Sequence, residues 1–248
     1  MNRAKNYLLI DISNSFTKLA VSSPKRISRP SRIPTPQLTS AYLRRFVRGR
    51  KIDMFVVCSV VPKKNREVRS AAGKTRTLWL GPNLKLGVGI DYPAPKTIGA
   101  DRLANAAAVA ALYGCPAIVV DFGTAVTFDI VSGQKKYVGG VIAPGLEAMT
   151  NFLYQRTALL PKLSLKEPRS AIGRSTIQAM MAGAIFGYRG LVKELIGRIR
   201  TEMRSRSKIK IVATGGYAKL IAARLPEIRA VHPHLTLEGL RIVANLNA

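Results

Sequence analysis

Two segments of this chain repeat one local pattern, and this repeat constrains the fold more than any other feature of the sequence. The first segment, LLIDISNSFTKLAV, covers residues 8–21, and the second, AIVVDFGTAVTFDIV, covers residues 117–131. Each has an apolar run that ends in an aspartate, a short turn of small or hydroxyl-bearing residues, and a second apolar run. Apolar runs bounded by turn residues indicate buried strands. The pattern therefore predicts two β-hairpins and an internal duplication.

Both turns carry more polar groups than a hairpin needs. A plain hairpin requires only a residue pair that tolerates positive φ, such as Asn-Gly. Backbone N–H groups and hydroxyls that converge in a tight turn can bind phosphate oxygens, and Asp11 or Asp121 at the strand end could hold a cation against them. Two such turns could hold a nucleotide's phosphates from both sides. Two ordinary hairpins with hydrogen-bonded turns are the alternative, and the matched pair favours the nucleotide.

The strong positive charge is the main argument for a different kind of protein. The formal charge is +27 over 248 residues, enough to attract nucleic acid or an anionic membrane surface. However, the basic residues are spread over both halves of the chain, as is typical of a solvated surface. The segment Tyr42–Asp53 predicts an amphipathic helix with a basic outer face, without the interleaved aromatic residues that stack bases. We therefore expect nucleic-acid contact only through a non-specific basic surface.

Cysteine use and hydropathy indicate a cytoplasmic protein without membrane contact. Cys58 and Cys115 match neither a disulfide framework nor a metal knuckle, which fits a reducing compartment. The apolar run at residues 7–10 is too short for a signal peptide. The weakly polar stretch 103–120 approaches membrane-spanning length, but a Gly-Cys-Pro break divides it, so we predict a helix followed by a buried strand.

Two further segments carry polar or small residues at informative positions. In residues 91–114, a proline-rich loop gives way at Gly99 to an alanine-rich helix with Asp101 in its first turn, where an acid complements the helix dipole. Taken alone, Asp101 is a capping residue. Residues 172–203 predict one long helix that begins at Ser175 or Thr176, with small residues four apart that permit close helix packing.

Together these motifs resemble the type III pantothenate kinase family, within the superfamily of acetate kinase, sugar kinases, Hsp70 and actin. DISNSFTK resembles the family's first phosphate motif, GADR its substrate motif and DFGTAVT its second phosphate motif, followed by GGVIAPG, GRST and ATGG. The resemblance covers essentially the whole chain. It implies an α/β, two-lobed actin-like ATPase (ribonuclease H-like) fold with a duplicated mixed-sheet core. The implied lobes are residues 1–115 and 116–248.

The resemblance implies ATP-dependent phosphorylation of pantothenate to 4′-phosphopantothenate, the first step of coenzyme A biosynthesis. It also implies a homodimer with the substrate site at the subunit interface, Asp101 as general base, Asp121 as ligand of a monovalent cation (K⁺ or NH₄⁺), and Asp11 as ligand of Mg²⁺. The implied pantothenate-binding residues are Tyr92, Gly99, Ala100, Asp101, Arg102 and Thr176. The implied ATP-binding residues are Asp11, Ile12, Ser13, Asn14, Ser15, Phe16, Thr17, Lys18 and Thr124.

One position departs from the family pattern, because Ser13 stands where the first motif has glycine. If this position needs positive φ or the closest approach of the backbone to a phosphate, a serine side chain costs about 1 kcal/mol or more and weakens ATP binding. Together with the basic charge, this departure keeps an alternative open: a non-catalytic ATP-binding regulator or nucleic-acid-associated homologue of the same fold. The intact GADR and DFGTAVT motifs favour the kinase.

Overall fold

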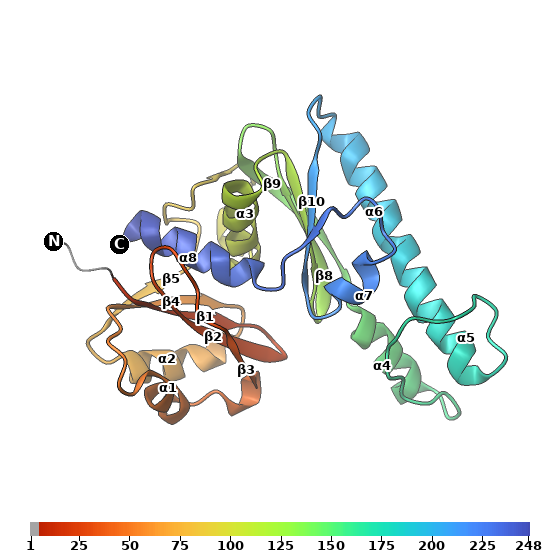
Figure 1. Cartoon of the computed structure of the whole chain (residues 1–248), viewed down its shortest axis with the longest axis horizontal. Coiled ribbons are helices and arrows are strands. Elements are labelled where there is room, and N and C mark those ends of the chain that lie inside the picture. Colours follow the sequence, from red (N-terminus) through yellow and green to blue (C-terminus); the bar gives the residue numbers. More distant parts are fainter. Residues whose placement is uncertain (1–4) are drawn as a thin grey trace. The chain divides into compact units, whose positions relative to one another are not determined.

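The computed structural model describes residues 5–248, which divide into two compact units (Figure 1). Among the described residues, the first unit contains 5–114, Lys135–Val138 and His234–Ala248, and the second contains Cys115–Gln134 and Gly139–Pro233. The chain thus leaves the first unit near the predicted lobe boundary at 115/116 and returns to it twice. The chain forms two sheets, one centred on β1 (Tyr7–Ile12) and one centred on β7 (Ala117–Phe122).

The first unit has a five-stranded sheet in the order β3-β2-β1-β4-β5. Its central strand β1 pairs antiparallel with β2 and parallel with β4, so the predicted first hairpin is confirmed. The strands are β1 (Tyr7–Ile12), β2 (Phe16–Ser22), β3 (Ser31–Pro34), β4 (Met54–Ser59) and β5 (Arg76–Trp79). All six residues of β1 are buried, as expected for a strand with helices on both faces.

Helices cover both faces of this sheet (Figure 1). On one face, α1 (Ser40–Val47) and α2 (Asn65–Ala72) bury Leu43 and Val68 against alternate residues of β1 and β4. On the other face, α3 (Ala100–Leu112) and α8 (Leu235–Asn247) pack together and contact β4, and α8 also contacts β1. The predicted helix over 42–53 is wrong beyond Val47, because the chain turns at Gly49 with φ 73°.

Close packing of α3 against α8 depends on small residues. A Cβ at Gly239 of α8 would overlap the carbonyl oxygen of Ala104 in α3 and lie 2.6 Å from its carbonyl carbon. One turn away, the Thr236 hydroxyl donates to Asn105 Oδ1 at 3.0 Å within the buried contact. The predicted C-terminal lobe, 116–248, includes α8, which instead completes the first unit because its apolar face covers β1 and β4.

The second unit repeats the strand pattern of the first. Its central strand β7 (Ala117–Phe122) pairs antiparallel with β8 (Ala125–Val131) and parallel with β10 (Lys210–Gly215), so the second predicted hairpin is also confirmed. β11 (Ala230–Val231) lies beside β10, and β9 (Lys136–Pro144) lies beside β8. The short strand β6 (Gly89–Ile90) pairs with Lys136 and Tyr137 at the start of β9, and these four residues belong to the first unit.

The helices of the second unit are α4 (Leu146–Arg156), α5 (Thr176–Ala182), α6 (Tyr188–Met203) and α7 (Ala218–Ala222). Their apolar faces bury one face of the sheet, including Ile118, Val120 and Phe128. The predicted single helix over 172–203 begins at Thr176 and contains a π turn, Gly183–Gly187, between α5 and α6. Insertions of this kind recur at functional sites.

The segment between α4 and α5 is tied to this unit by Arg189, a buried residue of α6. Its guanidinium donates to both carboxylate oxygens of Glu167 at 2.8 and 2.6 Å. It also donates to the carbonyls of Leu220 and Ile221, at 2.7 and 3.2 Å, at the end of α7. One side chain therefore connects the segment before α5 to the helix after the ATGG motif.

Residues 103–120, the stretch of nearly membrane-spanning length, form part of α3, a turn and part of β7, as predicted. In the part of the chain that the structure describes, no helix combines the length and the hydropathy needed to cross a bilayer.

Candidate active site

The first hairpin holds a buried carboxylate beside two polar partners. Asp11 is 2% exposed; its Oδ1 accepts a hydrogen bond from the Ser13 hydroxyl at 3.0 Å, and its Oδ2 lies 3.7 Å from Lys18 Nζ. Burial raises the pKa of Asp11 above its ordinary value of 3.8, while Lys18 and the Ser13 hydroxyl oppose that rise. A bound cation would stabilise the ionised form of this buried carboxylate, because the charge of the cation compensates for the hydration that the carboxylate loses on burial.

Ser13 fits its position without backbone strain. Among the described residues, only Lys135 and Arg204 are non-glycine residues with positive φ, so Ser13 does not need the conformation that favours glycine. Its N–H donates to the Phe16 carbonyl at 3.2 Å, which closes the turn. The strain considered for this departure from the family motif is therefore absent, and the serine adds a hydrogen bond to Asp11.

Thr35, which the sequence did not single out, supports the first turn. Its hydroxyl donates to the Ser13 carbonyl at 2.6 Å, lies 3.1 Å from the Thr17 hydroxyl, and is buried. The side chains of Ile12 and Thr17 are also buried, so they offer a phosphate their backbone only. Asn14 and Ser15 are exposed at the tip of the turn.

The GADR motif forms the N-terminus of α3, as predicted. Gly99 is the N-cap, and Asp101 lies in the first turn, where its Oδ1 accepts the Arg102 N–H at 2.9 Å. A Cβ at Gly99 would lie 2.6 Å from Asp101 Oδ1, so glycine leaves room for the carboxylate there. Ala100 is the first residue of the helix and, like Asp101, is partly exposed.

Tyr137 brings two of the predicted pantothenate-binding residues together. The Arg102 guanidinium lies 5.6 Å from the centre of the Tyr137 ring, and the Tyr92 ring packs edge-on against the same ring with centroids 6.1 Å apart. Tyr137 is the second residue of β9, far from both residues in sequence. The YVGG segment could have indicated a strand, but nothing in it indicated this contact.

In the second unit, Asp121 lies near the end of β7 between two threonines. It is in register with Thr214 of β10 and with Thr127 of β8, so the three side chains share one face of the sheet. Gly215 has φ 93°, and a Cβ there would lie 2.6 Å from Asp121 Oδ1. The carboxylate oxygen therefore lies against the bare backbone at the end of β10.

Thr124 and Thr176, also in the second unit, are both exposed. Thr124 is at the tip of the second hairpin, where its carbonyl accepts the Gly145 N–H at 3.1 Å. Thr176 begins α5, and the Ser175 hydroxyl caps the helix by accepting the Gln178 N–H at 3.3 Å. The predicted start of this helix is confirmed.

The predicted residues are thus divided between the units. Asp11 to Lys18, Tyr92 and Gly99 to Arg102 belong to the first unit, and Asp121, Thr124 and Thr176 belong to the second. Among the described residues, no group of three or more His, Cys, Asp or Glu side chains could hold a metal ion. A cation would therefore depend on Asp11 or Asp121 together with hydroxyl, backbone, water or phosphate oxygens.

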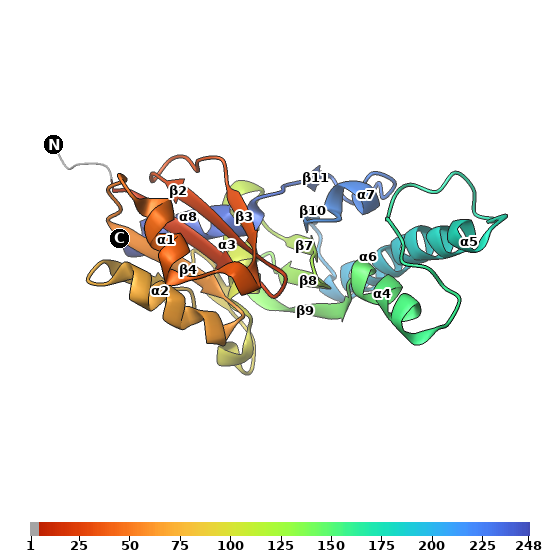
Figure 2. The same ribbon diagram turned by 90° about the horizontal axis from the view of Figure 1, so that it is seen from below.

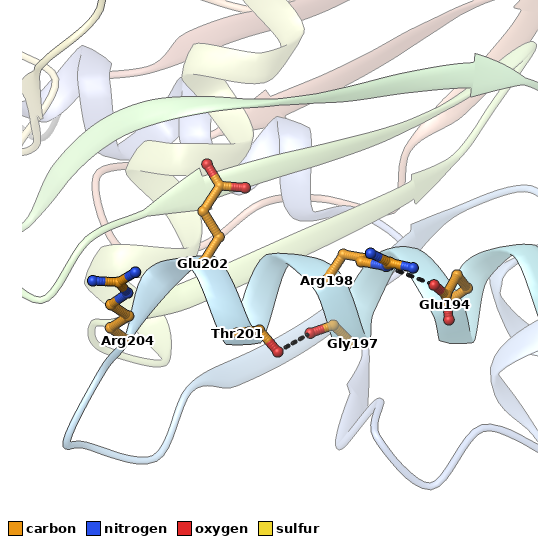
Figure 3. Close-up of a pocket in the computed structure, with 6 residues that line it drawn as sticks. All are labelled: Glu194, Gly197, Arg198, Thr201, Glu202 and Arg204. Carbon is orange, nitrogen blue, oxygen red and sulfur yellow. Dashed lines mark hydrogen bonds and ion pairs between the residues drawn. The ribbon is translucent and has the colours of Figure 1, made fainter.

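A hollow along α6 contains none of these residues (Figure 3). Arg198 donates to Glu194 at 2.7 Å, and the Thr201 hydroxyl donates to the Gly197 carbonyl at 3.1 Å, both within one turn of the helix. Four of the six lining residues thus pair with one another along the helix surface. This hollow offers no arrangement for phosphoryl transfer.

Comparison with solved structures defines the class of protein. The chain aligns with a polyphosphate/ATP-glucomannokinase from Arthrobacter (TM-score 0.53, 13% identity, 98% of this chain and 100% of that chain). It also aligns with the activator of 2-hydroxyisocaproyl-CoA dehydratase from Clostridium difficile, solved with ADPNP (TM-score 0.53, 11% identity, 99% and 95%). The fold is therefore the actin-like ATPase fold, as predicted.

Sequence comparison identifies the family within this class. The sequence model of type III pantothenate kinase matches residues 7–198. The type III pantothenate kinase of Akkermansia muciniphila is 50% identical over 243 residues, which cover 97% of this chain and 99% of that protein. The chain belongs to the type III pantothenate kinase family.

Proposed function

We propose that this chain uses ATP to phosphorylate the 4′-hydroxyl of pantothenate, giving 4′-phosphopantothenate for coenzyme A biosynthesis. One observation carries the proposal: in a member of this family, Asp101 lies at the N-terminus of α3, with Gly99 leaving space beside its carboxylate. Arg102 and Tyr92 converge on Tyr137 in the same unit. These residues supply a base, a cation and aromatic surface for a small carboxylic acid that carries an alcohol.

Asp101 is the general base of the proposed reaction. As the bond between the attacking hydroxyl oxygen and the γ-phosphorus forms and the bond to the ADP oxygen breaks, the hydroxyl proton passes to the Asp101 carboxylate. Arg102 pairs with the pantothenate carboxylate, and Tyr92, Gly99 and Ala100 line the substrate. Phosphoryl transfer needs alignment and charge neutralisation more than covalent chemistry from the protein.

The two hairpins hold the ATP phosphates in this proposal. The first hairpin offers the backbone of its turn, the hydroxyl of the exposed Ser15 and Lys18, and Thr124 at the tip of the second contacts ATP. Asp11 holds Mg²⁺ and Asp121 holds K⁺ or NH₄⁺; the buried Asp11 carboxylate beside a hydroxyl supports the first assignment, since Mg²⁺ prefers oxygen ligands. When bound, these cations neutralise charge on the phosphate oxygens.

The proposal includes a homodimer formed through α4 and α5, which lie beside each other in both views (Figures 1 and 2). Around these helices the chain exposes many large apolar side chains, and such patches mark interaction sites. They are Ile142, Met149, Phe152, Leu153, Tyr154, Leu159, Ile172, Ile177 and Phe186. A Cβ at Gly183 or Gly187 meets nothing within 4 Å, so space for close helix packing is open. Thr176 is exposed beside this patch and contacts pantothenate in the dimer.

ADP release from ATP, with and without pantothenate at high potassium, tests the activity. We expect pantothenate-stimulated release that Asp101→Asn reduces by about 10²-fold or more, since general-base catalysis contributes this much. Asp91→Asn is the matched control: Asp91 is exposed and its ion pair with Lys136 spans 3.6 Å, so this variant should turn over normally. Normal turnover in Asp101→Asn would refute the assignment of the base.

Light scattering tests the dimer. Phe152→Asp should give a monomer that binds pantothenate weakly, whereas Leu112→Asp, an exposed apolar position on α3, should remain dimeric. A dimer that persists in Phe152→Asp would refute this interface.

The alternative is a non-catalytic ATP-binding or nucleic-acid-associated protein. It is supported by the +27 charge and by the Ser13 side chain in the first phosphate motif, although Ser13 does not have positive φ. No turnover together with tight, salt-sensitive DNA binding would favour it. The proposal also includes a cytoplasmic location, because Cys58 and Cys115 form no disulfide, which suits a reducing compartment.

A further inference from the structure

The Thr214 hydroxyl lies buried without a hydrogen-bond partner. Thr214 is 1% exposed, and its Oγ1 has no partner among the residues that the structure describes. Leaving a buried hydroxyl unsatisfied destabilises a fold, so native structures nearly always supply a partner, such as an ordered water or an ion. A valine would fill the same space without this cost. The hydroxyl therefore points to a partner from outside the chain.

The position of Thr214 indicates what that partner is. Thr214 is in parallel register with Asp121 on the neighbouring strand, so both side chains leave the same face of the sheet, about 5 Å apart at the backbone. The preceding residue, Ala213, points the opposite way into the core that α6 and α7 cover. Asp121 Oδ1 lies against the backbone of Gly215, the residue after Thr214. The buried hydroxyl and the carboxylate thus lie side by side at the end of β10.

We infer that Thr214 Oγ1 is a second protein ligand of the monovalent cation that Asp121 is proposed to hold, an inference that rests on the proposed function. A hydroxyl oxygen can offer a lone pair to K⁺ while its proton is directed elsewhere. One carboxylate and one neutral oxygen suit a singly charged ion, because the site then carries no excess negative charge. The ATGG motif thereby has a role in cation binding in addition to its glycine turn.

Thermal unfolding at constant ionic strength tests the inference without turnover. The wild type, Thr214→Val, Thr214→Ser and Asp121→Asn are compared in choline chloride and in KCl, each with a non-hydrolysable ATP analogue. The wild type and Thr214→Ser should unfold at a higher temperature in KCl, whereas Thr214→Val should lose most of this shift. In choline chloride, Thr214→Val should be at least as stable as the wild type, because it lacks the unsatisfied hydroxyl.

Kinetics gives a second readout. The K⁺ concentration for half-maximal rate should rise about tenfold or more in Thr214→Val, since one oxygen ligand of the cation has been removed, and each factor of ten is about 1.4 kcal/mol. Thr214→Ser should restore the K⁺ requirement of the wild type.

The remaining outcomes of the unfolding experiment distinguish failure of the inference about Thr214 from failure of the proposed cation site. An unchanged K⁺ shift in Thr214→Val overturns the inference while the Asp121 site stands. A wild type that does not respond to K⁺, or an Asp121→Asn variant that responds fully, overturns the proposed cation site itself. If Thr214→Val keeps its K⁺ shift and loses stabilisation by the ATP analogue, the hydroxyl belongs to the nucleotide, and the inference is refuted.

Discussion

Gly239→Ala is the sharpest test of the packing that completes the first unit. The added Cβ would overlap the Ala104 carbonyl oxygen and lie 2.6 Å and 2.9 Å from the carbonyl carbon and Cα of Ala104. All three are backbone atoms of α3, so no side chain can rotate away to make room. Either α3 or α8 must move, and both helices contact the sheet.

The magnitude follows from two opposing effects. Overpacking a core costs about 1–3 kcal/mol, and a rigid backbone neighbour places this site at the upper end. Alanine recovers about 1 kcal/mol relative to glycine in a helix interior. The net loss is about 2 kcal/mol, which lowers the unfolding temperature by about 4–8 °C in a unit of this size.

Fluorescence of Trp79, the single tryptophan, reports on this unit because Trp79 lies in β5. Gly197→Ala in α6 is the matched control: a Cβ there meets nothing within 4 Å, so the second unit should gain about 0.5–1 kcal/mol, measured by circular dichroism. If Gly239→Ala unfolded at the wild-type temperature by Trp79 fluorescence, the close contact between α3 and α8 would contribute nothing to stability.

Three further predictions concern individual polar groups. Burial raises the pKa of Asp11, so the folded state favours the protonated carboxyl. This contribution to the stability of the folded state is complete below pH 3.8 and is lost as the pH rises through the raised pKa. Asp11→Asn should therefore unfold at an equal or higher temperature at pH 7 and lose turnover; a lower temperature would contradict this. Hydrogen bonds from Arg189 lower the pKa of Glu167, so the folded state favours the ionised carboxylate. The contribution of Glu167 to the stability of the folded state is therefore present above pH 4.5 and is lost as the pH falls through the lowered pKa. The stability difference between wild type and Glu167→Gln should shrink below pH 4.5 in thermal scans; a constant difference would rule out this titration. Ser13→Gly should cost about 1 kcal/mol in urea unfolding through the lost hydrogen bond to Asp11, and a gain would indicate hidden strain at Ser13.

Local patterns predicted the elements that carry the candidate site. Each hairpin is encoded within about fifteen residues, because its apolar runs, aspartate and turn are contiguous in the sequence. The N-terminus of α3 at Gly99 and that of α5 after Ser175 were readable for the same reason, since caps are local signals. The roles assigned to Asp101 and Thr176 came from resemblance to the family and stay proposals.

Features that depend on distant segments were not predictable in this way. Tyr137 meets Arg102 only because β9 brings it there, and Thr35 reaches the first turn through β3. The π turn at 183–187 follows the same small-residue spacing as a regular helix, so periodicity alone did not reveal it. The partnerless hydroxyl of Thr214 likewise appears only when β10 is placed beside β7.

Because α8 belongs to the first unit, the first unit is complete only after all of the second has been synthesised. Domains generally fold from the N-terminus onward as the ribosome makes the chain. Here the face of β1 and β4 that α8 covers stays open until residues 234–248 have been translated. The second unit has all of its residues by Pro233, so it can fold while the first still waits for its last helix. A nascent chain that stalls in this interval exposes apolar strands to chaperones and proteases.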